Sequence, residues 1–361
     1  MHTKKQSPNV RARIKSLMQI KETERLWHFP VIAGLCVGVC LLIGWYFDMP
    51  NFGKLSSLGA MVILYLTPAP LANRMVQMAV CAFGLIFAFA SGIVFSFHPL
   101  ASAFSIFFVA FLANFVTSYF ETPAPGRFFF IMLVAIASSM PFDVYKIPTN
   151  VGLVAMGALL AVILAFLYSV FIARNIRLPR QAKKSNRRGY THVIESLIIG
   201  LFLGGSILIG HAFKLDTPYW ITVSAAAIIQ GRDFLHMRER NIQRITGTFV
   251  GIGLTWLIFL TQPNLLVIVL LITLLQFIVE MLVVRNYGIA AVFITPLTIL
   301  LAEMDSPNLV DTTYLMSTRL IDTIIGSLIG LLAGLILHQQ SIIQQLEKQF
   351  REAYFKWSGK I

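Results

Sequence analysis

The sequence predicts an all-α membrane protein of about twelve transmembrane helices, arranged as two parallel six-helix repeats. The first observation is composition: of the 361 residues, 57% are apolar and only 12% are charged, and the mean hydropathy is +0.76. One water-soluble core cannot bury that much apolar surface, which argues against a soluble enzyme. The second observation is a series of twelve charge-poor apolar runs, and the third is an uneven distribution of cations between the loops.

The first 26 residues precede the apolar runs. Residues 10–26 interleave basic side chains such as Arg11 and Lys15 with apolar ones such as Ile14 and Leu17. This pattern predicts an amphipathic helix on the inner membrane surface, with its basic groups toward anionic headgroups. The first apolar run is long enough to span and lacks a small-residue cleavage site, so we interpret it as a retained span rather than a signal peptide.

Twelve runs follow in order, and a bilayer core about 30 Å thick needs roughly 20 helical residues to span it. The first repeat, 27–173, contains 27–47, 55–69, 75–96, 100–119, 128–140 and 149–173. After a basic linker, 174–191, the second repeat, 192–338, contains 192–212, 217–230, 243–262, 264–284, 288–303 and 312–338.

The two halves resemble each other in more than the number of runs. In each half the second and fifth runs are short, and a long run follows each of them. The stretch ANRMVQMAVCAFG (72–84) aligns with RNIQRITGTFVG (240–251), with the final glycines matched. These similarities indicate an internal duplication. An even number of spans per half makes the repeats parallel rather than inverted.

The loops predict the orientation. With the N-terminus inside, the cytoplasmic segments hold 25 of the 29 Lys and Arg residues, and the outer loops hold only Lys54, Lys146 and Lys214. This positive-inside split predicts that both termini lie in the cytoplasm. The net charge of +13 therefore reflects topology, and we predict no binding of nucleic acid.

The tail, 339–361, is amphipathic. Its apolar residues Ile343, Leu346, Phe350 and Tyr354 follow helical spacing. That face fits either the inner leaflet or a partner subunit, so the sequence leaves a homo-oligomer open.

No catalytic motif is present in the sequence. There is no Walker A, G-x-S-x-G or H-E-x-x-H pattern, and the seven histidines are scattered. Cys36, Cys40 and Cys81 all lie in apolar runs, as packing residues do. We therefore predict no enzyme activity, no cofactor and no metal.

Charged residues inside the predicted spans are the main functional candidates, because a charge at a helix centre costs roughly 2.5–3.5 kcal/mol on insertion scales. Arg319 and Asp322 lie one turn apart in the last span. They form either a structural ion pair or part of an anion or proton pathway. Glu280 lies near the inner end of the tenth span, where it either carries a proton or reaches interfacial water.

The second repeat also contains glycine rows, a proline within a span and an aromatic pair, each of which has a structural or a functional interpretation. Rows of glycine allow close helix approach, and here they predict packing in the bundle interior: Gly247, Gly251, Gly326, Gly330 and Gly334. Pro296, directly after Thr295, interrupts the short eleventh span, and such interruptions point to a transporter's central site. Tyr219 and Trp220 fit an interfacial aromatic belt or the same site.

A basic turn follows the eighth span. It contains Arg232, Arg238, Arg240 and Arg244. These residues form either a solvated cytoplasmic face or a funnel that attracts organic anions.

Three motifs in the second half resemble those of the fusaric acid resistance proteins, the aromatic acid exporter superfamily. The first contains Tyr219, Trp220, Gln230, Arg240, Arg244, Gly247, Thr248 and Gly251; the second Asn286, Tyr287, Phe293, Thr295 and Pro296; the third Arg319, Asp322, Thr323 and Gly326. Together they cover about 120 residues in the right order. Many long relatives carry a cytosolic domain after each six-span block, where this sequence has a short linker and a short tail.

The resemblance implies an inner-membrane transporter that exports aromatic or lipophilic organic acids, driven by the proton gradient and sometimes assisted by a membrane-fusion partner. The predicted substrate-binding residues are Arg319, Arg244, Arg240, Trp220, Tyr287, Asn286, Thr295 and Pro296. Asp322 or Glu280 is predicted to carry the coupling proton. A passive organic-anion channel of the same fold, as in the distantly related aluminium-activated malate channels, and a non-transporting envelope scaffold are the alternatives.

Overall fold

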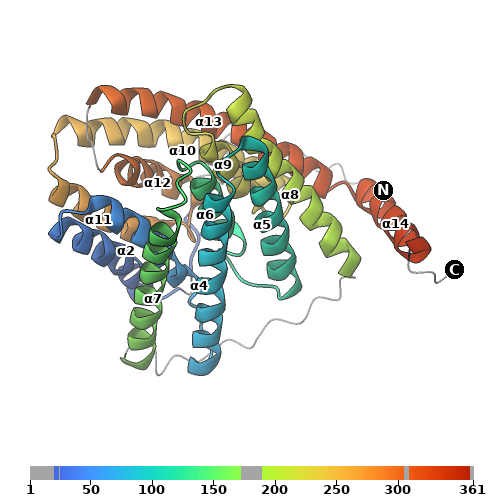
Figure 1. The fold of residues 1–361 in the computed structure, drawn as a ribbon, viewed down its shortest axis with the longest axis horizontal. Helices are drawn as coiled ribbons and strands as arrows, with labels where there is room; N and C mark the ends of the chain where they lie inside the picture. Colours follow the sequence, from blue (N-terminus) through green and yellow to red (C-terminus); the bar gives the residue numbers. More distant parts are fainter. Residues whose placement is uncertain (1–19, 24, 172–188, 305–308, 358–361) are drawn as a thin grey trace, which may run out of the picture.

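The computed structural model describes residues 20–23, 25–171, 189–304 and 309–357, and within them the protein is helical with no strand (Figure 1). The first half contains α2 (His28–Tyr46), α3 (Pro50–Ala60) with the 3-10 helix η1 (Met61–Tyr65), α4 (Leu71–Val94), α5 (Pro99–Tyr119), α6 (Phe128–Ser138) and α7 (Ile147–Phe171). The second half contains α8 (Gly189–Ala212), α9 (Tyr219–Ile229), α10 (Phe234–Leu260), α11 (Leu265–Leu282), α12 (Tyr287–Glu303) and α13 (Leu309–Leu337), followed by α14 (Gln340–Trp357).

These helices confirm the all-α membrane class. In the described residues, eight helices are long and apolar enough to cross a membrane, and three shorter apolar helices, α6, α9 and α12, lie among them. Every predicted apolar run overlaps one of the helices. The predicted amphipathic residues 10–19 and most of the basic linker lie outside the described residues.

Several helices begin where the sequence offers a cap for their free N–H groups. The side chains of Asp233, Asn264 and Asn286 each accept a backbone hydrogen bond at the start of α10, α11 and α12. Pro50 occupies the first turn of α3, where its missing N–H costs nothing. Of the four short segments, α3 and α12 therefore begin at a residue suited to a helix start, whereas no side chain caps α6 or α9.

Helix packing follows one scheme in the two halves. In the first half, α3 packs on α7, and α4 packs on both α6 and α7; in the second half, α9 packs on α13, and α10 packs on α12 and α13. The halves meet where α5 packs on α8 and where α2 packs on α11. Figure 1 shows α10 and α13 running across the direction of α4 and α7. Helices of 24 to 29 residues exceed the bilayer core at 1.5 Å per residue, which leaves length for tilted spans.

The start of α10 corrects one prediction. The third apolar run of the second half was expected to begin at residue 243, after a basic loop, but α10 begins at Phe234. Arg238 and Arg240 therefore lie on the helix. A hydropathy window misses this beginning, because His236, Arg238, Glu239 and Arg240 fall in the first two turns after the Asp233 cap.

The tail packs partly on its own chain. Ile343 of α14 joins Ile194 and Ile198 of α8 in a small apolar cluster. The inner leaflet and a partner subunit were the two occupants expected for this face, and α8 covers part of it instead.

Candidate functional site

Arg319 of α13 lies inside the second half. Its side chain is buried, and its guanidinium carbon lies 3.0 Å from the centroid of the Trp220 ring of α9. Its Nη2 donates to Thr298 Oγ1 of α12 at 3.0 Å. Its Nε and Nη1, which carry three of the five N–H groups, have no hydrogen-bond partner. Trp220 is only 8% exposed, so it lies beneath a cation rather than in an interfacial belt.

Asp322 lies one turn further along α13 and is fully buried. Its Oδ2 accepts a hydrogen bond from Thr217 Oγ1 at 2.8 Å, and its Oδ1 has no partner. Both Asp322 and Arg319 are described, and no ion pair joins them. The structural ion pair expected as one alternative is therefore absent from this structure, and the arginine and the carboxylate each keep free hydrogen-bonding capacity.

Arg244 of α10 forms the next part of the site, nearer the end of the bundle at which α12 begins. It is 4% exposed, and its partners are hydroxyl groups: Nη1 donates to Tyr287 Oη at 3.2 Å and Nη2 to Ser224 Oγ at 3.4 Å. Its Nε has no partner. Arg244 is close enough to Arg319 for the two charges to repel each other.

Arg240, one turn before Arg244, is half-buried. Its guanidinium lies over the Tyr287 ring, 4.0 Å from the centroid. Its Nε donates to the Ala227 carbonyl at 3.2 Å, and its Nη2 donates to Gln230 Oε1 at 3.4 Å. We call Arg240, Arg244 and Arg319 the arginine cluster.

The arginine cluster has too little negative charge around it. Buried cations are normally paired with carboxylates, but the hydrogen bonds of these three side chains go to hydroxyl, amide and carbonyl oxygens. Buried donors without partners cost free energy unless a further group satisfies them. An anion, and above all a carboxylate that accepts several N–H bonds from guanidinium groups, is the ligand that would fit.

The other predicted residues have different contacts. Asn286 Oδ1 caps α12 by accepting from the Ile289 N–H at 3.1 Å. Thr295 Oγ1 donates to the Ala291 carbonyl at 3.0 Å. Arg232 and Arg238 are exposed, so the basic turn divides between the surface and the arginine cluster.

The glycines lie at helix contacts. A side chain at Gly247 or Gly251 would meet α12, and one at Gly326 or Gly330 would meet α9. Pro296 has no N–H to donate to the Val292 carbonyl four residues earlier, and Gly251 approaches that carbonyl closely. At Gly334 an added Cβ would meet the Met237 sulfur.

Glu280 of α11 lies apart from the arginine cluster. It is buried, and its Oε2 pairs with Nη2 of Arg25 at 3.0 Å. Arg25 also donates to the Glu280 carbonyl at 3.3 Å, and its guanidinium lies over the Phe29 ring. This pair ties the segment before α2 to the C-terminal end of α11.

Arg25→Gln is therefore expected to destabilise the protein. It leaves the Glu280 carboxylate buried without its cation, which costs up to about 3 kcal/mol. Thermal unfolding in detergent should show a lower midpoint, and the double variant Arg25→Gln/Glu280→Gln should recover most of the loss. An unchanged midpoint in the single variant would show that the pair contributes no stability.

Three hydroxyl residues complete the site and were not expected from the sequence. Ser224 and Thr298 accept from the arginines, and Thr217 donates to Asp322. Single hydroxyls are common in apolar spans, so their residue type alone carries no signal.

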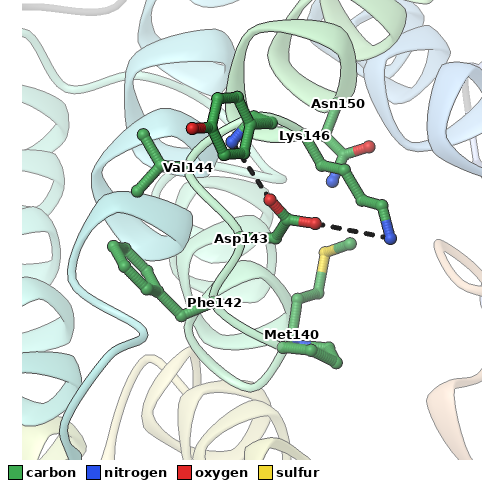
Figure 2. Close-up of a pocket in the computed structure, with 8 residues that line it drawn as sticks. Met140, Phe142, Asp143, Val144, Lys146 and Asn150 are labelled. Carbon is green, nitrogen blue, oxygen red and sulfur yellow. Dashed lines mark hydrogen bonds and ion pairs between the residues drawn. The ribbon is translucent and has the colours of Figure 1, made fainter.

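A surface hollow of about 570 Å³ lies elsewhere, where α6 leads into α7. Figure 2 shows it lined by Met140, Phe142, Val144 and Asn150, with Lys146 Nζ paired to Asp143 Oδ2 at 3.4 Å. None of the arginine cluster lines this hollow. In the described residues no three His, Cys, Asp or Glu side chains gather as metal ligands.

The fold and the arginine cluster together define a helical membrane protein with a buried cationic site. Residues 205–333, which contain α9 to α12, most of α13 and the cluster, match the family model described as fusaric acid resistance protein-like. The resemblance predicted from the motifs is thereby confirmed.

Two curated proteins are similar to part of the chain. The uncharacterized membrane protein YvaC of Bacillus subtilis (strain 168) is 33% identical over 159 residues, 44% of this chain and 25% of that protein. The p-hydroxybenzoic acid efflux pump subunit AaeB of Musicola paradisiaca (strain Ech703) is 26% identical over 157 residues, 40% of this chain and 24% of that protein. The chain thus matches about a quarter of the length of these relatives. No solved structure matches.

Proposed function

We propose that this protein is an inner-membrane secondary transporter that exports aromatic or lipophilic carboxylates. The observation that carries the proposal is the arginine cluster, in which the buried Arg244 and Arg319 keep unpartnered N–H groups. The similarity to an efflux pump subunit for p-hydroxybenzoic acid supports both the direction and the substrate class. Arg240 and Arg244 meet the anion from the inner side, and Arg319 binds it above Trp220.

Asp322 is the group we assign to proton coupling. Its Oδ1 is buried without a partner, and Arg319 is one helical turn away without pairing to it. Export driven by inward-moving protons requires the proton and the anion to bind in turn rather than together. Asp322 therefore takes up a proton after the anion has left and releases it before the next anion binds. Glu280, by contrast, already has Arg25 as its partner.

The twelve-helix arrangement in two parallel repeats is part of the proposal. Helix pairs recur between the halves, and so do the glycine contacts: Gly34 and Gly38 of α2 pack on α11, and Gly200 and Gly204 of α8 pack on α5. The distribution of Lys and Arg supports a topology with both termini in the cytoplasm.

The arginine cluster lies in the second repeat, whereas the described part of the first repeat has a single buried arginine, Arg74, which donates to Ser169 Oγ at 2.9 Å. Gly157 of α7 contacts α3 as Gly326 of α13 contacts α9, and this register aligns Arg319 with Asn150 and Asp322 with Leu153. One chain therefore offers one anion site. A homo-oligomer or a membrane-fusion partner would add to this unit.

Transport in proteoliposomes tests the proposal, with labelled p-hydroxybenzoate as the probe. A pH gradient should drive its accumulation against its concentration. Asp322→Asn should abolish this accumulation and keep downhill exchange, because the amide cannot take up the proton. The matched control is Asp143→Asn, at the surface hollow, which should behave as wild type.

Three outcomes would contradict this mechanism. Gradient-driven accumulation by Asp322→Asn equal to wild type would remove the proton role. Flux that never accumulates substrate under any pH gradient would indicate a passive channel, and no flux at all would favour a scaffold.

A further inference from the structure

A loop of the first half covers the inner end of α9. Arg127, which precedes α6, donates from Nη2 to the carbonyl of Ile229, the last residue of α9, at 2.8 Å. Its Nη1 donates to Asn114 Oδ1 of α5 at 2.6 Å. The adjacent Gln230 donates from Nε2 to the Pro125 carbonyl of the same loop at 3.1 Å.

This contact is charged and half-buried. The last carbonyls of a helix carry partial negative charge and bind cations well, which explains why Arg127 lies at Ile229. Burial lowers the pKa of Arg127 to about 10, opposed by the nearby Glu195, so the guanidinium remains protonated at neutral pH. Charge-assisted hydrogen bonds of this kind are stronger than neutral ones, so they favour the arrangement in which the loop and α9 stay together.

The same end of α9 also touches the arginine cluster. Gln230 is bonded on one side to Pro125 and on the other to Arg240, and Arg240 is also bonded to the Ala227 carbonyl. Arg240 in turn lies over Tyr287, whose hydroxyl accepts from Arg244. A continuous series of contacts therefore links the loop before α6 to the anion site.

We propose that Pro125, Arg127, Ile229 and Gln230 form a gate, closed in this structure, between the inner side and the arginine cluster. The inference rests on the transport function proposed above and adds the residues that control access to its site. An anion arriving at Arg240 competes with Gln230 and Ala227 for the guanidinium. By linkage, whatever weakens the bonds of Arg240 to α9 favours separation of α9 from the loop.

Cysteine accessibility tests the gate without any substrate. Ser224→Cys places a thiol beside Arg244, and the native cysteines Cys36, Cys40 and Cys81 are buried. A membrane-impermeant thiol reagent is applied to inside-out vesicles, with the chain lacking Ser224→Cys as the blank. Adding Arg127→Gln should accelerate labelling about tenfold, because a charge-assisted bond holding the gate is lost. Gln230→Ala should act in the same direction.

Arg232→Gln is the matched control, since Arg232 is exposed beside Gln230, and it should leave the labelling rate unchanged. Labelling rates within twofold of the Ser224→Cys parent in both Arg127→Gln and Gln230→Ala would overturn the gate. Faster labelling in vesicles that transport no carboxylate would keep the gate and refute the transport function. Unchanged labelling in vesicles that do transport carboxylate would refute the gate and leave the transport function standing.

Discussion

Arg319→Gln is expected to abolish transport of aromatic carboxylates while the protein remains in the membrane. The substitution removes the charge above Trp220 and the donors Nε and Nη1 that no protein group uses. Losing one member of a buried hydrogen-bonded charge pair costs about 2–5 kcal/mol, which is roughly 30-fold or more in affinity. Resistance of a sensitive strain to an aromatic acid measures the effect, and binding of p-hydroxybenzoate to purified protein confirms its origin.

Two further variants make this result specific. Arg319→Lys keeps the charge without the planar fork and should retain partial activity. Arg238→Gln removes an exposed arginine of α10 and should leave resistance unchanged. Full resistance with Arg319→Gln, at wild-type protein levels, would refute the anion site.

The sequence predicted the most unusual residue of this site well and its surroundings less well. Arg319 stands out because a cation inside a span is costly, and the structure places it beside Trp220, another candidate. Thr298 and Ser224, which hold the guanidinium groups, could not be chosen among the many hydroxyls of the apolar runs. Which of them faces an arginine depends on how α9 and α12 are rotated in the bundle.

Asn286 and Arg127 show two other limits of the sequence. Asn286 belongs to a motif and has a side chain suited to bind ligands, but its oxygen caps α12; a cap and a ligand group look alike in a sequence. Arg127 is one cation in a short loop, typical of positive-inside topology. Its contact with Ile229 joins residues about a hundred positions apart, and no local pattern reports that.

The fold itself followed from apolar runs, because each span must satisfy its own backbone within the bilayer. The packing of these spans did not follow from the runs. Glycine rows indicated close contacts but did not name the partners, and the structure gives α9 as the partner of Gly326 and Gly330 and α11 as the partner of Gly34 and Gly38.

Among glycine-to-alanine substitutions in the second half, Gly326→Ala should destabilise the protein most. An added Cβ would meet the Ile221 carbonyl of α9 and would lie 2.8 Å from Ser224 Cβ. Both are parts of a packed helix, and the backbone carbonyl cannot rotate away, so α13 must move off α9. Overpacking of this kind costs about 1–3 kcal/mol or more, which exceeds the gain of up to about 1 kcal/mol from replacing helical glycine by alanine.

The measurement is thermal unfolding in detergent together with binding of p-hydroxybenzoate. Because Arg319 lies two turns before Gly326 and Ser224 contacts Arg244, the shift of α13 should weaken both stability and binding. Gly253→Ala is the control, since nothing lies within 4 Å of its added Cβ, and there the helix-propensity gain should leave stability equal or slightly higher. A Gly326→Ala protein as stable and as active as Gly253→Ala would show that close contact between α9 and α13 is not what holds the arginine cluster in place.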